Sequence, residues 1–186
     1  ENDIKMHKAI SIIQFKLEGQ LIQRNPGFHM ENRRLLHLID YEKGTIRIGE
    51  RELELLDKNF PTIDPKAPYR LTAEEQDIME RLEQAFLGCE KLQDHMKFLL
   101  TKGSLYKVYN GNLLYHGCVP LNADGSLKEV KIHGKSYKGK GLYEALEIYV
   151  RKGFFAVDEH ERKIGRDMMW YIWLHPDSPL FGKDKM

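Results

Sequence analysis

The residue of this chain best suited to chemistry is a histidine that ends an apolar run. Segment 113–115 is Leu-Leu-Tyr, His116 follows it, and Gly117 then lets the backbone turn into a loop. Ligands of α/β proteins bind outside the carboxyl ends of strands, and a neutral imidazole suits transition metals. Taken alone, a strand-end His-Gly pair is more often bonded to backbone than to a metal, so both interpretations stay open at this point.

A metal ligand at this position would suit the hydrolysis of phosphate esters. Two metal ions about 3.5–4 Å apart can lower the pKa of a bridging water and stabilise the developing charge. A strand end also holds a ligand more rigidly than a loop does. A single imidazole does not make such a centre, because a dinuclear site needs several anionic and imidazole ligands in a fixed geometry.

Segment 134–141, Gly-Lys-Ser-Tyr-Lys-Gly-Lys-Gly, is close to the phosphate-binding loop G-x-x-x-x-G-K-[ST]. Its last position is Gly141, so the hydroxyl that would bind Mg²⁺ is absent. A hairpin turn and the start of a helix explain the glycines better than nucleotide binding does. The lysines could still attract a sugar phosphate electrostatically.

Three further positions are candidates of lower weight. The segment Ser178-Pro-Leu-Phe-Gly-Lys183 has no regular pattern, and Lys183 could present its ammonium group to a phosphate. Cys118 would need a nearby base and a lowered pKa to act as a nucleophile. Asp167 could orient a ligand, but it lies in an aromatic-rich segment, which is more often core. The other histidines show no i, i+4 pair and no H-E-x-x-H motif.

The composition indicates a soluble globular protein of 186 residues, with 41% apolar and 31% charged residues. Twenty-nine basic residues balance 28 acidic ones, which argues against a nucleic-acid partner. No apolar run approaches the roughly 18 residues of a membrane span. The two cysteines, Cys89 and Cys118, form no C-x-x-C motif and suit a reducing compartment. We therefore expect a cytoplasmic protein without a membrane partner.

The first part of the chain predicts a helix and a small antiparallel sheet. Apolar residues recur at spacings of three and four from Met6 to Leu21, which predicts a helix over about 4–24 that Asn25-Pro26 ends. Alternating segments predict two or three half-exposed strands at 36–40, 45–49 and 52–56. A proline-rich loop follows at 59–68.

Thr72 and Glu75 fit a capping box at the start of the next helix. Its apolar face runs from Ile78 to Leu99, and Lys102-Gly103 ends it. We expect this face to pack against another surface, either within the chain or on a second copy. The remaining elements are predicted as strands at 105–109, 113–116, 127–133 and 135–137, and helices at 142–155 and 164–174. The pattern predicts an α+β chain with a boundary near Lys102.

Several segments resemble one known family. Segments 7–18, 102–116 and 178–183 resemble class III fructose-1,6-bisphosphatases, and 113–120 resembles the strand–His–Gly–Gly–x–x–Pro element of calcineurin-like metallophosphoesterases. Cys118 stands where related phosphatases usually carry a second glycine, a departure that this bisphosphatase family shares. The resemblance covers most of the chain, but the family's chains are far longer. We therefore expect an internal fragment of such an enzyme.

The resemblance implies hydrolysis of the 1-phosphate of fructose 1,6-bisphosphate to fructose 6-phosphate, in gluconeogenesis, with a pair of manganese ions. His116 would bind one ion, and Lys183 would contact the substrate phosphate. By their proximity in sequence, in the loop after Pro120, Asn122 and Asp124 are expected near the mouth of the site. Residues 102–186 would form part of an α/β metallophosphoesterase sandwich, and residues 1–101 a helical and β-hairpin insertion.

The family's other metal motifs are Asp-x-His, Gly-Asp-x-x-Asp, Gly-Asn-His-Asp and Gly-His-x-Pro, and this sequence contains none of them. The chain by itself is therefore expected to be inactive. The alternative is a non-enzymatic interaction or regulatory module, whose amphipathic helices bind a partner or a second copy in a homo-oligomer. The two hypotheses differ in whether His116 has other metal ligands near it in space.

Overall fold

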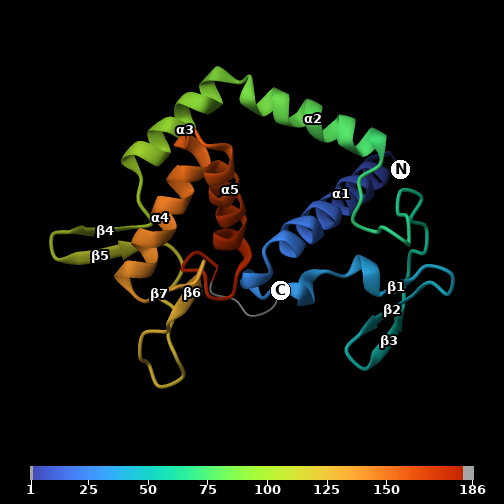
Figure 1. Ribbon diagram of the computed structural model, residues 1–186, viewed down its shortest axis with the longest axis horizontal. Helices are drawn as coiled ribbons and strands as arrows, with labels where there is room; N and C mark the ends of the chain where they lie inside the picture. Colours follow the sequence, from blue (N-terminus) through green and yellow to red (C-terminus); the bar gives the residue numbers. More distant parts are fainter. Residues whose placement is uncertain (1, 182–186) are drawn as a thin grey trace. The chain divides into compact units, whose positions relative to one another are not determined.

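The computed structural model describes residues 2–181, which fall into two compact units, Glu1–Gly88 (unit 1) and Cys89–Met186 (unit 2). Each unit combines helices with small antiparallel sheets, so the predicted α+β class is confirmed (Figure 1). Within the described residues, none of the helices combines the length and the apolar character that crossing a membrane requires.

Unit 1 contains two helices with a small sheet between them in sequence. The helices are α1 (Asn2–Arg24) and α2 (Ala73–Leu87), and the strands are β1 (Ile39–Asp40), β2 (Thr45–Ile48) and β3 (Arg51–Glu54). Short 3-10 turns precede the sheet at Pro26–Phe28, Glu31–Arg33 and Leu36–Leu38. The strands pair antiparallel in the order β1-β2-β3, with Ile46 opposite both Ile39 and Leu53. The predicted helix and sheet are both confirmed.

The core of unit 1 forms where α1 meets the loop after the sheet. Ile12 of α1 packs with Leu36, Ile63 and Tyr69 in one buried cluster. Gly19 makes this possible, because a Cβ there would lie 2.0 Å from a Tyr69 ring carbon. The N-terminal end of α1 lies away from this core, since Met6 and Ile10 are exposed.

A buried ion pair joins the two helices of unit 1. Lys16 Nζ lies 2.6 Å from Glu75 Oε2 and donates to the Thr62 carbonyl at 2.6 Å. The same carboxylate oxygen accepts from the Thr72 amide, and the Thr72 hydroxyl accepts from the Glu75 amide, so the predicted capping box is confirmed. Burial raises the pKa of Glu75, but the hydrogen bonds from Lys16 and Thr72 outweigh it and hold the pKa below its usual value.

The predicted single helix from Thr72 to Lys102 is wrong. Helix α2 ends at Leu87 and α3 begins at Glu90, with Cys89 extended between them at φ −84° and ψ 94°. Gly88 favours such a break, because glycine loses more conformational freedom in a helix than other residues do. Within the described residues, the side chains of the apolar face are largely exposed, among them Ile78, Leu82, Phe86 and Leu99, so its packing against another surface stays a prediction.

Unit 2 contains two hairpins and a helical pair. Its elements are α3 (Glu90–Lys102), β4 (Tyr106–Tyr109), β5 (Asn112–Tyr115), β6 (Val130–Ile132), β7 (Lys135–Tyr137), α4 (Lys140–Phe155) and α5 (Glu159–Leu174). Asn110-Gly111 and His133-Gly134 form the two-residue hairpin turns, and all four have positive φ. This is the geometry that matches the twist of hairpin strands. Both predicted hairpins are confirmed.

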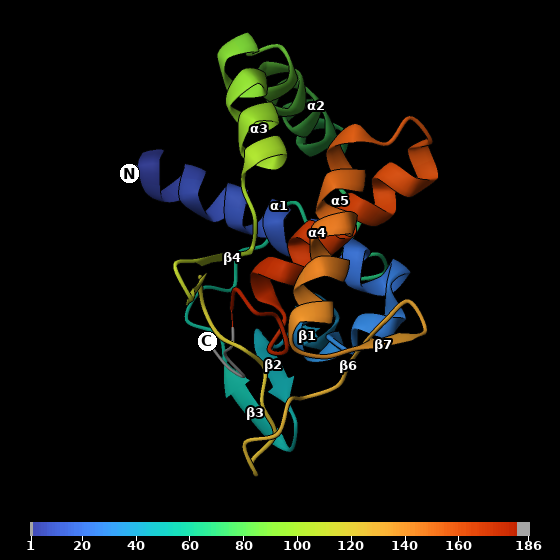
Figure 2. The ribbon, with the colours of Figure 1, turned by 90° about the vertical axis from the view of Figure 1, so that its left-hand side faces the viewer.

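Helices α4 and α5 lie side by side and form the core of unit 2 (Figures 1 and 2). Leu142 and Leu146 of α4 and Met168 of α5 are fully buried. The helices approach closely at two glycines, since a Cβ on Gly165 would lie 2.1 Å from the Gly153 nitrogen. The closest contact of the pair is therefore backbone against backbone.

Candidate functional site

His116 comes directly after β5, as the sequence predicts, and its side chain is exposed. The β4–β5 hairpin that carries it pairs Tyr106 with Tyr115 and Tyr109 with Asn112. The tight turn at Asn110-Gly111 fixes this register, because the pairing on both sides of a two-residue turn is set by the turn itself. The position of His116 at the end of a strand is confirmed, and its role as a metal ligand stays a prediction.

The loop after His116 packs against a turn about 60 residues further along the chain. Gly117 has φ 87°, and a Cβ there would lie 2.2 Å from the Pro179 carbonyl oxygen and 3.0 Å from the Leu180 Cα. The Cys118 amide donates to the same Pro179 oxygen at 2.8 Å. Glycine is needed at position 117 both for its backbone angle and for this close contact.

Ser178 organises the opposing turn. It is fully buried, its hydroxyl donates to the Ile172 carbonyl of α5, and the Leu180 amide donates to that hydroxyl at 3.1 Å. The Ser178 amide in turn donates to the His175 carbonyl at 2.9 Å. The turn that receives Gly117 is therefore anchored to the end of α5.

Tyr143 of α4 holds the same loop from another side. Its hydroxyl donates to the Cys118 carbonyl at 2.8 Å, and its ring meets those of Tyr106 and Tyr115 edge to face. Burial raises the pKa of Tyr143 to about 12, so the phenol keeps the proton that it donates. Cys118 is thus hydrogen-bonded at both its amide and its carbonyl, which fixes the path of the chain next to His116.

Asn122 and Asp124 form a turn of their own. The side-chain Nδ2 of Asn122 donates to the Ser126 hydroxyl at 2.9 Å, and Asp124 accepts from both the backbone amide and the hydroxyl of Ser126. Both hydrogen bonds lower the pKa of Asp124 below its usual value, and the one from the Ser126 hydroxyl has the larger effect. Their predicted place at the mouth of a site stays a prediction.

The glycines of segment 134–141 lie in a hairpin turn and at the start of a helix, as the sequence predicts. Gly134, with φ 79°, completes the β6–β7 turn, and Gly139, with φ 49°, precedes α4. The structure gives no further support to a nucleotide-binding loop.

Within residues 2–181, no group of three or more His, Cys, Asp or Glu side chains is arranged to hold a metal ion. His116 is thus one potential ligand without a complete set around it. The other predicted site residue, Lys183, lies outside the described residues. Sequence reasoning did not identify Tyr143 and Ser178 as the residues that hold the loop. Ser178 belongs to a segment that carried the family resemblance, whereas nothing in the sequence distinguishes Tyr143 from an ordinary core tyrosine.

The comparisons with known proteins agree with the motifs that meet here. A model of the Firmicute fructose-1,6-bisphosphatase family matches residues 1–186. The chain belongs to this family. It is 54% identical to the class 3 fructose-1,6-bisphosphatase of Alkaliphilus metalliredigens over 193 aligned residues, which cover 100% of this chain and 29% of that protein.

Two other class 3 fructose-1,6-bisphosphatases are similar to the same degree. The proteins of Clostridium botulinum (strain Loch Maree) and Clostridioides difficile (strain 630) are each 54% identical over 183 residues, which cover 98% of this chain and 27% and 28% of those proteins. The chain therefore spans less than a third of the length of these relatives. No solved structure matched it.

Proposed function

We propose that this chain acts as part of a cytoplasmic sugar bisphosphatase. The enzyme removes the 1-phosphate of fructose 1,6-bisphosphate and gives fructose 6-phosphate, with a pair of manganese ions, in gluconeogenesis. The observation that carries this proposal is the contact between the His-Gly loop and the Ser178–Leu180 turn. Both segments resemble motifs of the family, and in this fold they are in direct contact.

His116 would be this chain's ligand to the metal pair. A neutral imidazole is a suitable donor for a manganese ion, and the hydrogen bonds on Cys118 keep the loop next to it in one conformation. The metal pair, when bound, would activate the attacking water. The remaining ligands would come from outside the described residues, among which no cluster of metal ligands is present.

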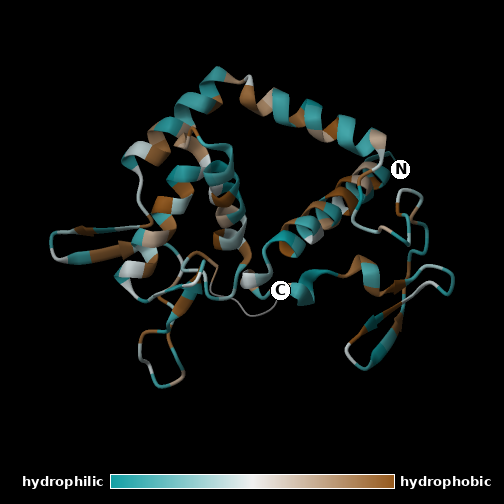
Figure 3. Cartoon of the chain, viewed as in Figure 1, coloured by the Kyte–Doolittle hydropathy of each residue, from teal (hydrophilic) through white to brown (hydrophobic). Residues whose placement is uncertain are grey.

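The exposed apolar surface of unit 2 supports a place within a larger protein. Leu113 and Leu114 of β5 are each 54% exposed, and Val108 of β4 is 62% exposed. The brown segments of β4 and β5 in Figure 3 mark this apolar hairpin. Contiguous exposed apolar residues usually mark a surface that another part covers. Under this proposal, residues 102–186 contribute to a metallophosphoesterase sandwich, and residues 1–101 form an insertion.

A chimera tests the proposal. The aligned 183 residues of the Clostridioides difficile relative are replaced by those of this chain. The chimera should release phosphate from fructose 1,6-bisphosphate with Mn²⁺ present. His116→Ala should abolish this activity, whereas His160→Ala, a matched change at an exposed position of α5, should leave it intact. Lys183→Gln should raise KM, because it removes a proposed phosphate contact.

The 186-residue chain by itself should be inactive in the same assay. A folded but inactive chimera beside an active parent would contradict the proposal and favour the alternative, an interaction module. Activity of the isolated chain that is lost in His116→Ala would instead show that a complete metal site forms within these residues.

A further inference from the structure

A basin in unit 1 is lined by basic and amide side chains and by no acidic one. Its volume is about 530 Å³, which is within the range of small-molecule sites. The polar side chains around it are Gln20, Gln23, Arg34, His37, Lys66 and Arg70. Tyr69 contributes its buried ring to the same wall.

Arg34 is held in place before any ligand arrives. Its guanidinium lies 4.9 Å from the centre of the Tyr69 ring and pairs with Glu31 at 2.8 Å. These contacts position the guanidinium in advance, which lowers the cost of ordering it when a ligand binds.

Tyr69 holds His37 in the wall of the basin. The Tyr69 hydroxyl accepts from the His37 amide at 3.4 Å and lies 2.7 Å from His37 Nδ1. These two contacts fix the position of the imidazole in the lining of the basin.

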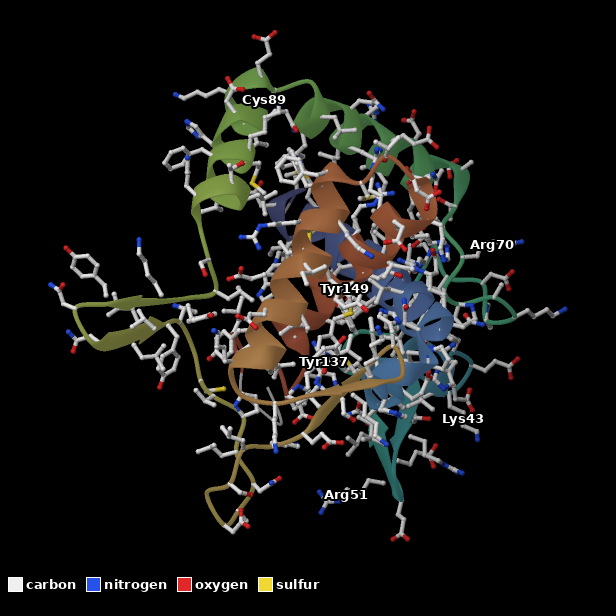
Figure 4. The ribbon with its side chains drawn as sticks, turned by 60° about the vertical axis from the view of Figure 1, so that its left-hand side comes forward. Lys43, Arg51, Arg70, Cys89, Tyr137 and Tyr149 are labelled. Carbon is white, nitrogen blue, oxygen red and sulfur yellow. The ribbon has the colours of Figure 1, made fainter. Side chains whose placement is uncertain are left out.

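Lys66 and Arg70 complete the positive rim. Both are exposed, and Figure 4 shows Arg70 extending from the segment before α2. Arg70 is paired with Asp64 at 3.1 Å, while the Lys66 ammonium has no ion-pair partner in the part of the chain that the structure describes. The two nearby acids, Glu31 and Asp64, are each paired already and do not line the basin.

We propose that this basin binds a small metabolite that carries a phosphate group. The guanidinium groups of Arg34 and Arg70 can donate charge-assisted hydrogen bonds to phosphate oxygens, and Lys66 adds a point charge. A nucleic acid would need an extended basic surface, and the net charge of the chain is only +1. The proposal uses residues of unit 1 alone, none of which has a role in the proposed function.

The test is a titration of the 186-residue chain with glycerol 3-phosphate and, in parallel, with inorganic phosphate, in about physiological salt to screen weak surface attraction. Amide chemical shifts in NMR spectra report binding at each residue. We expect saturable shifts at residues 34–37 and 66–70. The variant Arg34→Gln/Lys66→Gln/Arg70→Gln should weaken binding at least about tenfold, since it removes three charge-assisted contacts.

A matched control removes the same kinds of charge elsewhere in unit 1. Lys43→Gln/Arg47→Gln/Arg51→Gln also replaces two arginines and one lysine, on the exposed β1–β3 hairpins, and should change the affinity less than about twofold because no direct contact is lost. Figure 4 labels Lys43 and Arg51 of this set. If the triple variant of the basin unfolds, the single variant Lys66→Gln still tests the proposal, because this exposed side chain can be changed without loss of the fold.

Equal weakening by the two triple variants would overturn the proposal, since overall charge would then explain the binding. Absence of saturable shifts in the unmodified chain would overturn it as well. Equal affinities for glycerol 3-phosphate and inorganic phosphate would contradict the assignment to a metabolite and leave a site for free phosphate.

Discussion

In unit 1 an ion pair connects the two helices, with Lys16 Nζ and Glu75 Oε2 buried 2.6 Å apart. In unit 2 the helical pair is connected by backbone contact at Gly153 and Gly165. A buried charge depends on its partner and on pH, whereas two backbones in contact depend only on the absence of side chains between them. The two units should therefore be destabilised by different substitutions and respond differently to pH.

The chain allows the two units to be followed separately. Its two tryptophans, Trp170 and Trp173, both lie in α5, so their fluorescence reports the unfolding of unit 2. Hydrogen exchange of the α1 amides reports the opening of unit 1.

The largest effect is expected for Lys16→Met. It leaves the Glu75 carboxylate buried without its cation, and breaking a buried pair in this way costs about 3–5 kcal/mol. Exchange of the α1 amides should accelerate, while the midpoint of the tryptophan transition in urea stays unchanged. The control is Lys43→Met, which breaks an exposed pair with Asp40 and should cost at most about 1 kcal/mol. Similar effects of the two variants would show that burial of the pair is unimportant.

Gly165→Ala should have the next largest effect, and in the other unit. Its Cβ would lie 2.1 Å from the Gly153 nitrogen, so α4 and α5 must separate at a cost of about 1–3 kcal/mol or more. The tryptophan transition should move to lower urea, with α1 exchange unaffected. Gly141→Ala, in α4 with no atom near its Cβ, should instead stabilise unit 2 by about 0.5 kcal/mol. If Gly165→Ala left the urea midpoint of the tryptophan transition unchanged, the close contact between the two helices would be contradicted.

Tyr143→Phe sharpens the comparison within unit 2. It leaves the Cys118 carbonyl without its donor at a cost of about 1 kcal/mol. The loop next to His116 should loosen, so the Cys118 amide should exchange faster than amides of α4. Tyr109→Phe is the control, because Tyr109 is 62% exposed at the hairpin tip. Unchanged exchange at Cys118 would indicate that Pro179 alone holds the loop.

Acid below about pH 4.5, the pKa of an unperturbed glutamate, should give the smallest and most gradual effect. The pKa of Glu75 is lower in the folded chain than in the unfolded chain, so its contribution is present above the unfolded pKa and is lost as pH falls through the folded pKa. Burial raises the pKa of Glu147 in unit 2 too, and hydrogen bonds from Ser104 and Arg151 lower it overall. The Lys16–Glu75 pair is the more buried. Stability of α1 should therefore fall more steeply with acid than the tryptophan signal.

Prediction from the sequence failed where a long apolar pattern crossed Gly88. The apolar residues from Ile78 to Leu99 keep helical spacing through this glycine, so the pattern predicts one helix although the chain forms two. Spacing also does not say whether a face is covered, and much of this face is exposed in the described chain. The family, by contrast, was predicted correctly from short motifs, because those motifs are specific even in a chain that spans less than a third of its relatives.

The sequence by itself determined the local features of this protein. The turns at Asn110-Gly111 and His133-Gly134, the capping box at Thr72, and the place of His116 after a strand all follow from residues a few positions apart. Only the tertiary structure decided which distant residues meet: Gly117 with Pro179, Tyr143 with Cys118, and Lys16 with Glu75. Local conformation follows from backbone sterics and neighbouring hydrogen bonds, whereas these partners are 25 or more residues apart and are selected by the packing of whole elements.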